Sequence, residues 1–198
     1  MPMRIGVLSL QGDYLAHAAM LRQLPGVDAC HVRDAGELAE AQGLIIPGGE
    51  STTIGKLLDR AGLIEPIVQR ARGGMPVYGT CAGLILMAER IEGSEQHRLG
   101  LMDMLVARNA FGRQIDSFEA AIPVPLLGAD PLRGVFIRAP YVVEAGPGVE
   151  VLARYEDRIV AVRQGVFMAS AFHPELTNDV RMHRLFADMV RSAQSGGR

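Results

Sequence analysis

Cys81 stands between two glycines in residues 79–83, Gly-Thr-Cys-Ala-Gly, with apolar residues on both sides of this segment. A nucleophile elbow needs this pattern, because the backbone doubles back between a strand and a helix and only small flanking residues allow it. The helix would begin near Ala82, where free N–H groups favour a thiolate and an oxyanion. The pattern therefore predicts a cysteine nucleophile, with a small buried residue of no chemical role as the alternative.

His173 and Glu175 follow the last predicted strand, residues 166–171, and one proline separates them. Proline restricts the backbone, so an extended conformation would direct both side chains to one side. His173 would take the proton of Cys81 and return it to the leaving amine, while Glu175 would orient the imidazole. The order Cys, His, Glu predicts a catalytic triad. The other histidines lack such a setting and are interpreted as surface or core residues, namely His17, His31, His97 and His183.

A second glycine pair lies in residues 47–52, Pro-Gly-Gly-Glu-Ser-Thr, after a short apolar strand. Adjacent glycines reach backbone conformations closed to other residues, and a helix start offers N–H donors. Gly48 and Gly49 are therefore candidates for an oxyanion and carboxylate cradle. The alternative is an ordinary turn before a helix over residues 53–58, with Ser51 or Thr52 as its N-cap.

Apolar strands alternate with helices through the first half of the chain. Strands are predicted over residues 3–10, 27–32 and 43–47, and helices over residues 14–24 and 37–42. This alternation predicts an α/β fold with a doubly wound, mostly parallel sheet and helices on both faces. Short β-type runs from residue 99 onward predict an antiparallel extension of the sheet: 104–108, 118–124, 135–138, 149–155 and 159–163. A C-terminal helix is expected over residues 178–191, and ligands collect at the carboxyl ends of parallel strands.

Composition narrows the class of protein further. The chain of 198 residues is 48% hydrophobic, which predicts one well-cored domain over residues 1–198. A net charge of -2 without blocks of like charge argues against nucleic-acid and membrane-surface partners. Two cysteines make no disulfide framework, and no apolar N-terminal segment is long enough for a signal peptide or membrane span, so a cytoplasmic location is expected. The spacing of histidines and cysteines indicates no metal site, and no cofactor is expected.

Together these motifs identify a resemblance to the class I, or triad, glutamine amidotransferases. Within that class, the chain is similar to the glutaminase subunits of ribose-5-phosphate-dependent pyridoxal 5'-phosphate synthases. The narrower resemblance rests on five segments, which are 10–12 (Leu-Gln-Gly), 108–114 (Arg-Asn-Ala-Phe-Gly-Arg-Gln), 116–119 (Asp-Ser-Phe-Glu), 134–140 (Gly-Val-Phe-Ile-Arg-Ala-Pro) and 172–176 (Phe-His-Pro-Glu-Leu). It spans nearly the whole chain. Ala16 departs from the pattern, because relatives often carry Glu there.

The resemblance implies roles for individual positions. It places Cys81, His173 and Glu175 in the triad. It implies glutamine binding by Gly49, Glu50, Ser51, Arg108, Ile137 and Arg138, and oxyanion stabilisation by Gly48, Gly49 and Ala82.

The resemblance also implies a reaction and a partner. L-Glutamine is hydrolysed through a glutamyl thioester, and ammonia passes to a barrel-shaped synthase subunit in a large hetero-oligomer. That partner makes pyridoxal 5'-phosphate from ribose 5-phosphate and glyceraldehyde 3-phosphate. The alternatives are a glutaminase serving another synthase, such as imidazole glycerol phosphate synthase, a cysteine hydrolase of another class, and a binding subunit without chemistry.

Overall fold

The structure is a computed structural model that describes residues 2–109 and 116–196. Residues 110–114 of the segment 108–114 lie outside the described residues. The first half of the chain alternates strands and helices as β1 (Met3–Leu8), α1 (Tyr14–Arg22), β2 (Val27–Val32), α2 (Ala35–Glu40), β3 (Gly43–Ile46), α3 (Ser51–Arg60), α4 (Ile64–Arg72), β4 (Val77–Thr80) and α5 (Ala82–Met87).

The second half consists mainly of strands and ends in a long helix. Its elements are β5 (Ala88–Ile91), β6 (Met102–Ala107), β7 (Ser117–Ile122), the 3-10 turn η1 (Pro125–Leu127), β8 (Leu132–Ile137), β9 (Tyr141–Ala145), β10 (Glu150–Tyr155), β11 (Arg158–Gln164), β12 (Phe167–Ser170), the 3-10 turn η2 (Pro174–Leu176) and α6 (Arg181–Gly196).

One large sheet runs through the molecule in the order β2-β1-β3-β4-β12-β11-β9-β6-β5, with β10 paired to β11. The strands from β2 to β12 are parallel to their neighbours, and β11 joins the antiparallel part. The predicted doubly wound, mostly parallel sheet with an antiparallel extension is confirmed. The order also makes β12, the last strand of the chain, the direct neighbour of β4.

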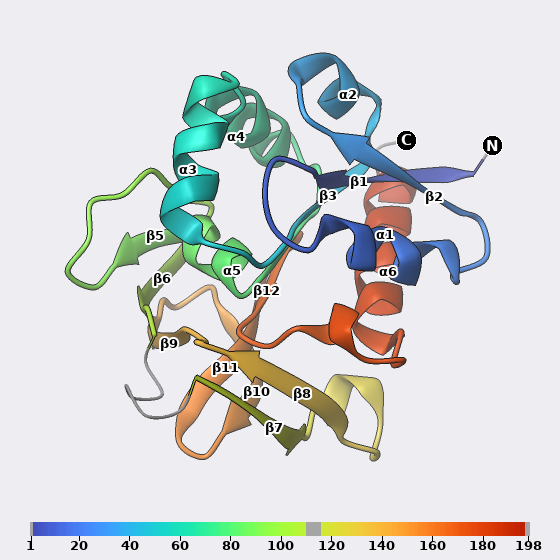
Figure 1. Ribbon diagram of the computed structural model, residues 1–198. Coiled ribbons are helices and arrows are strands. Elements are labelled where there is room, and N and C mark those ends of the chain that lie inside the picture. The colour runs from blue at the N-terminus through green and yellow to red at the C-terminus, as the bar shows by residue number, and fades with distance from the viewer. Residues whose placement is uncertain (1, 110–115, 197–198) are drawn as a thin grey trace.

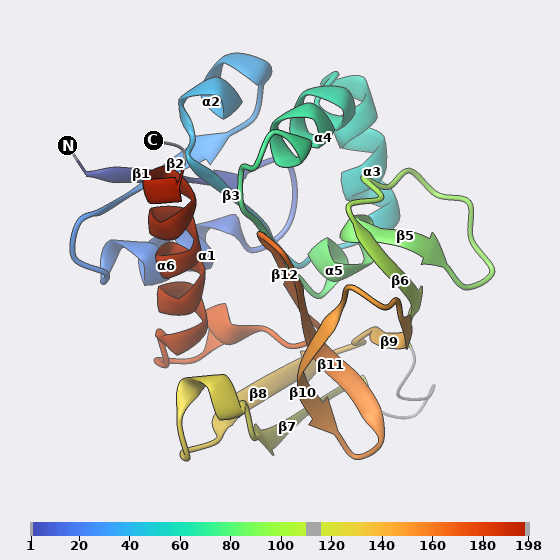
Figure 2. The ribbon, with the colours of Figure 1, turned by 180° about the vertical axis from the view of Figure 1, so that it is seen from behind.

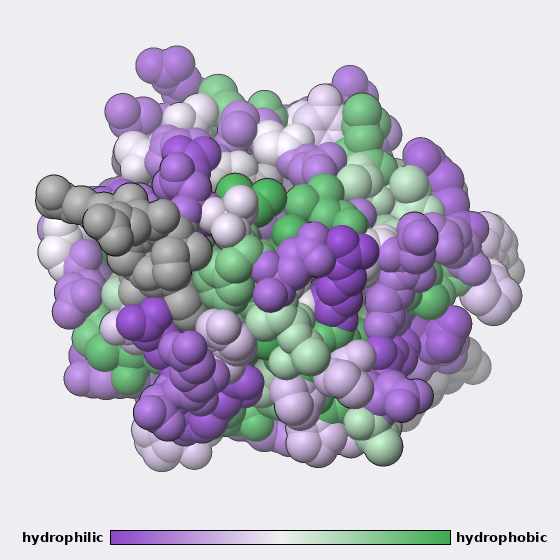
Figure 3. Space-filling model, turned by 60° about the horizontal axis from the view of Figure 1, so that its bottom comes forward, coloured by the Kyte–Doolittle hydropathy of each residue, from purple (hydrophilic) through white to green (hydrophobic). Residues whose placement is uncertain are grey.

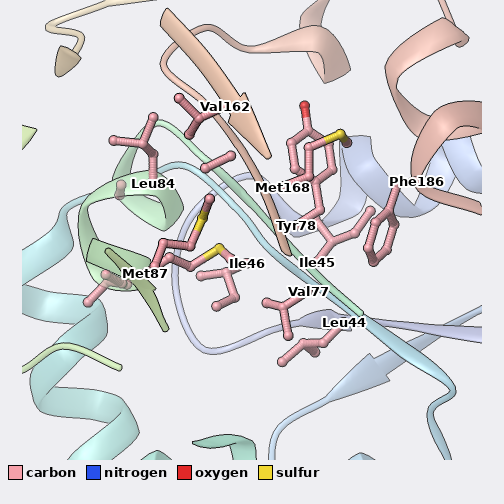
Figure 4. Close-up of a cluster of buried hydrophobic side chains, with 14 of the residues drawn as sticks. Leu44, Ile45, Ile46, Val77, Tyr78, Leu84, Met87, Val162, Met168 and Phe186 are labelled. Carbon is pink, nitrogen blue, oxygen red and sulfur yellow. The ribbon is translucent and has the colours of Figure 1, made fainter. Parts of the chain in front are cut away.

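Helices cover both faces of the parallel strands. Figures 1 and 2 show α1 and α6 on one side, and α3, α4 and α5 on the other. Continuous apolar runs such as Leu44–Ile46 are buried on both faces, as expected for parallel strands between two helical layers. Figure 4 shows side chains of β3, β4, α5, β12 and α6 meeting in this core, where the rings of Tyr78 and Phe186 lie 5.7 Å apart.

The surface is mixed in character. Figure 3 shows a mostly hydrophilic face with an apolar area near its middle. Large apolar side chains that reach solvent include Leu15 on α1 and Leu126 on η1. No helix in residues 2–109 and 116–196 is both long and apolar enough to cross a membrane.

The structure corrects several expected elements. Helix α4 and strands β5 and β9 are additions to the predicted elements. Strands β7 and β8 pair with each other in a separate two-stranded sheet, so that part of the predicted extension does not belong to the main sheet. The helix expected over residues 53–58 is longer, Ser51–Arg60. Its N-cap is Glu50, and the prediction of Ser51 or Thr52 was wrong.

Candidate active site

Cys81 lies on a sharp turn between β4 and α5, in the left-handed region of backbone conformation with φ 50° and ψ -102°. Few residues other than glycine adopt a positive φ, and such outliers concentrate at functional sites. The flanking glycines are required by space. A Cβ on Gly79 would lie 2.5 Å from the carbonyl carbon of Gly83, and a Cβ on Gly83 would lie 2.2 Å from the Ile46 oxygen. The predicted elbow is therefore present.

The histidine reaches this cysteine through strand pairing. Thr80 is in register with Ser170 on the parallel neighbour β12, and the Cys81 N–H donates to the Ser170 oxygen at 2.8 Å. The turn after β4 and the turn after β12 therefore lie together at the carboxyl edge of the sheet. His173 is held there by a hydrogen bond from its backbone N–H to the backbone oxygen of Val135 on β8, at 2.8 Å.

Glu175 lies directly behind the imidazole. His173 Nδ1 is 2.6 Å from Glu175 Oε1, and both residues are buried. The predicted extended geometry was wrong in detail, because η2 is a 3-10 turn. This tight turn brings the carboxylate to Nδ1, which leaves Nε2 of His173 as the ring atom available for proton transfer.

The electrostatics of His173 favour an imidazolium. Burial alone would lower the pKa of His173, but interactions with Cys81 and Glu175 outweigh burial and raise it to about 10. Cys81 Sγ lies 3.8 Å from the Ile137 oxygen, and His173 Nε2 is buried without a hydrogen-bond partner among the described residues.

A cavity of about 300 Å³ opens in front of the sulfur. All the predicted site residues line it except Gly48 and Glu175, which lie behind it; the lining ones are Gly49, Glu50, Ser51, Cys81, Ala82, Arg108, Ile137, Arg138 and His173. The cavity wall also includes Gln11, Ile85 and Asn109, which were not predicted. Gln11 belonged to the segment 10–12, but a lone glutamine after a strand gave no signal for a specific role.

The Glu50 carboxylate is already engaged by its own helix. It accepts hydrogen bonds from the Thr52 N–H at 3.1 Å, the Thr53 N–H at 2.8 Å and the Thr53 hydroxyl at 2.7 Å. Partial burial opposes ionisation, but these donors outweigh it and lower the pKa of Glu50. Glu50 therefore presents its backbone to the cavity.

Arg108 is fixed by a different loop. Its Nη1 donates to Gln96 Oε1 at 2.8 Å and approaches the Thr52 hydroxyl at 3.4 Å. Arg138 lies across the cavity at the end of β8, with a positive φ of 43°. Two guanidinium groups at one cavity suit a ligand with a carboxylate.

The glycine pair lies against the imidazole and the first loop. A Cβ on Gly48 would be 2.4 Å from His173 Cε1, so only glycine allows this approach. The Gly48 oxygen accepts a hydrogen bond from the Asp13 N–H at 3.2 Å. Because C=O and N–H point oppositely in a trans peptide, this contact fixes the direction of the Gly49 N–H as well.

Two of the histidines interpreted as surface or core residues are core residues, and one of them, His17, lies close to Glu175. His17 and His183 are fully buried, and His17 Nε2 lies 3.4 Å from Glu175 Oε2. Nothing near either residue in the sequence indicates this contact. Within residues 2–109 and 116–196, no group of three or more His, Cys, Asp or Glu could hold a metal ion.

The fold and this cavity together define a doubly wound α/β protein that brings a cysteine, a histidine and a glutamate together at the carboxyl edge of its sheet. The profile of the SNO glutamine amidotransferase family matches residues 7–192, and the chain belongs to this family.

Close relatives and a solved structure agree with this assignment. A protein named pyridoxal 5'-phosphate synthase subunit PdxT from Pelotomaculum thermopropionicum is 56% identical, over 98% of each chain. One of the same name from Desulforudis audaxviator is 55% identical, over 95% of this chain and 99% of its own. A crystal structure of a glutamine amidotransferase superposes with a TM-score of 0.89 at 49% identity, covering 94% of this chain and 98% of that one.

Proposed function

We propose that this glutamine amidotransferase hydrolyses L-glutamine with Cys81 as nucleophile, His173 as general base and acid, and Glu175 as the group that orients His173. One observation carries the assignment of roles. The turn that holds Cys81 and the turn that holds His173 leave neighbouring parallel strands, and Glu175 Oε1 lies 2.6 Å from the imidazole.

The chemistry follows from these positions. The Cys81 thiolate attacks the side-chain amide carbon of glutamine, and the N–H groups of Gly49 and Ala82 are the proposed donors to the oxyanion. His173 gives a proton to the amide nitrogen, ammonia leaves, and a glutamyl thioester remains. A water molecule then loses a proton to His173 and attacks the thioester, which releases glutamate and returns the thiolate.

Recognition of glutamine requires donors for its α-carboxylate at a distance from the sulfur. Arg108 and Arg138 supply such charge at the cavity, and Ser51 and the Ile137 backbone lie on its walls. The substrate amide is neutral, so the part near Cys81 needs N–H donors rather than a cation. The cavity separates these two requirements in space.

The protein is proposed to serve as the glutaminase subunit of a pyridoxal 5'-phosphate synthase. The names of the two relatives and the high identity over their full length support this role. Ammonia would pass to a barrel-shaped synthase subunit in a hetero-oligomer, which uses it with ribose 5-phosphate and glyceraldehyde 3-phosphate. We propose that residues 1–198 act as one cytoplasmic domain in that assembly.

The decisive experiment measures glutamate release from glutamine with the cognate synthase present, and pyridoxal 5'-phosphate formation in the same mixture. Both products are expected to depend on this chain. Glutamate release without pyridoxal 5'-phosphate, combined with activation by a different synthase, would assign the glutaminase to another pathway. Absence of glutamate release under all these conditions would reject the proposed function.

We expect the free protein to be poorly active, with docking to the synthase raising turnover about a hundred- to a thousand-fold, the effect of one oxyanion donor. In the free chain, the Asp13 N–H in the first loop holds the Gly48–Gly49 peptide in one orientation. Docking of the synthase is proposed to move this loop and to favour the orientation in which the Gly49 N–H faces the oxyanion. Turnover of the protein alone and with saturating synthase checks this, and equal rates would contradict it.

Replacing Arg108 with alanine is expected to raise the KM for glutamine by about ten- to a hundredfold, because a charged hydrogen bond to the α-carboxylate is lost. The effect on kcat should be smaller, since Arg108 is remote from the reacting carbon. Steady-state kinetics with saturating synthase measure both constants. Arg90→Ala, which removes a surface ion pair with Glu144, is the matched control. A loss of kcat at constant KM would contradict the assignment.

A further inference from the structure

A series of contacting buried polar side chains lies behind Glu175, away from the cavity. His17 on α1 and His183 on α6 are both 0% exposed. His17 Nδ1 lies 2.9 Å from His183 Nε2, and His17 Nε2 lies 3.0 Å from the Thr80 hydroxyl. The same Nε2 is 3.4 Å from Glu175 Oε2. This series of contacts links α6 to α1, and α1 to the carboxylate of Glu175.

The two imidazoles are neutral. Burial, followed by the charges of His183 and His173, holds the pKa of His17 well below its ordinary value. Burial lowers the pKa of His183 to about 4. Each ring therefore carries one N–H and one acceptor nitrogen at neutral pH.

The contacts select one tautomer for both rings. With hydrogen on both Nε2 atoms, His183 donates to His17 Nδ1 and His17 donates to the Thr80 hydroxyl, and the His17 Nε2 lies 3.4 Å from Glu175 Oε2. Of the four nitrogens in these two rings, only His183 Nδ1 then lacks a hydrogen-bond partner among the described residues, and it is an acceptor. The opposite tautomers would bury a donor without an acceptor there, and orphaned buried N–H groups are rarer than under-satisfied acceptors.

Glu175 needs such a donor. Its Oε1 is paired with His173, while Oε2 is buried and makes no hydrogen bond to any residue that the structure describes. A buried carboxylate oxygen without a donor is costly, and it leaves the carboxylate free to rotate. The other polar groups near it are committed elsewhere, since the Tyr78 hydroxyl is paired with Ser170 at 2.9 Å.

We propose that His17 is a positioning residue of the glutaminase: its Nε2–H, which is hydrogen-bonded to the Thr80 hydroxyl and lies 3.4 Å from Glu175 Oε2, attracts that oxygen and thereby helps to fix the carboxylate against His173. His183 fixes the tautomer of His17 by donating to its Nδ1. This inference rests on the proposed roles of Glu175 and His173. His17 touches neither the substrate cavity nor Cys81, so its effect is on the alignment of the triad.

The polar surroundings of Glu175 come from four other elements. His17 on α1 lies 3.4 Å from Glu175 Oε2 and in turn contacts His183 on α6 and Thr80 on β4. Tyr78 on β4 is paired with Ser170 on β12, and His173 lies beside Glu175 on the same turn. Two of these neighbours are neutral imidazoles and three are hydroxyls. His173 is the cation of this group. If the His17 N–H is removed, no other cation of this group compensates for it near Glu175 Oε2.

Two substitutions at the same position separate a donor from a space-filling role. His17→Leu removes the N–H and keeps an apolar side chain of moderate size, whereas His17→Gln retains an amide N–H near the position of Nε2. With saturating synthase, we expect kcat to fall about 10- to 100-fold in His17→Leu at nearly constant KM, because a misplaced catalytic group costs about this much. The acidic limb of its pH profile should move to higher pH. His17→Gln should recover most of kcat and the original limb.

Each outcome of these measurements either supports or overturns the positioning role of His17. Wild-type kcat and acidic limb in a folded His17→Leu protein, or equal losses in His17→Gln and His17→Leu, would overturn the positioning role. If His17→Leu does not fold, nitrogen-15 NMR of the wild-type imidazoles gives the answer. A neutral Nε2–H tautomer of His17 supports the proposal, and an Nδ1–H or doubly protonated ring overturns it. Wild-type glutamate release is measured in parallel, so a failure of the proposed function would be recognised separately.

Discussion

Replacing Cys81 with serine is expected to abolish glutamine hydrolysis, with kcat reduced by about 10⁴-fold or more, as for other covalent nucleophiles. A serine hydroxyl remains protonated beside an imidazolium, whereas the cysteine can supply a thiolate. Glutamate release with saturating synthase measures this loss. The serine variant should fold normally, because the elbow backbone depends on Gly79 and Gly83 rather than on the sulfur.

Cys30 provides the matched control for Cys81. It lies on β2, half-buried, and burial raises the pKa of its thiol. Cys30→Ser should retain turnover, and a glutamine-like electrophile should label Cys81 in the wild-type protein while leaving Cys30 unmodified. Labelling of Cys30 alone, or full activity in Cys81→Ser, would remove Cys81 from the mechanism.

Replacing His173 with asparagine is expected to have an effect as large as the loss of Cys81, because no other described group at the cavity can carry the proton between sulfur and leaving amine. Glu175→Gln should leave a measurable remnant, since the imidazole still finds its productive orientation part of the time. The ratio of the two residual activities is the measurement. Wild-type turnover in His173→Asn would contradict the triad.

The stability of the same variants reports the charge of His173. Its pKa is raised from 6.5 to about 10 by Cys81 and Glu175, which outweigh burial. A raised pKa means that protonated His173 contributes its full stabilisation below pH 6.5, and that this contribution is lost as the pH rises through about 10. The free energy of unfolding should therefore be higher for the wild type than for His173→Asn, and this difference should be largest near pH 6.5 and decrease toward pH 10. A difference that grows with pH would contradict the imidazolium.

The parallel core and the sharp turn at Cys81 could be predicted because they depend on local patterns. Apolar runs, alternating helices and the two glycines around Cys81 carry their meaning within a few residues. The cap of α3 could not, since serine and threonine are the usual N-caps and Glu50 fills the position with a longer side chain. The separate pairing of β7 with β8 depends on tertiary packing, which short β-type runs do not encode.

The support behind Glu175 was beyond sequence patterns for a different reason. His17 and His183 come from the two ends of the chain and meet only when α1 and α6 pack side by side. Neither residue stands in a motif, and a lone histidine in an apolar helix gives no sign of what lies across from it. The pair can be recognised only once the sheet order is known. Thr80 on β4 and Glu175, on the turn after β12, are the residues that His17 contacts.

The insertion of β12 between β4 and β11 has a consequence for the growing polypeptide. Cys81 is synthesised before the chain is half made, but the strand that pairs with β4 and leads to His173 is the last of all. If Cys81 and His173 act together as proposed, a nascent chain that ends before β12 holds the thiol without its base. Such a chain is then expected to release no ammonia, so turnover waits until β12 has been synthesised and has paired with β4.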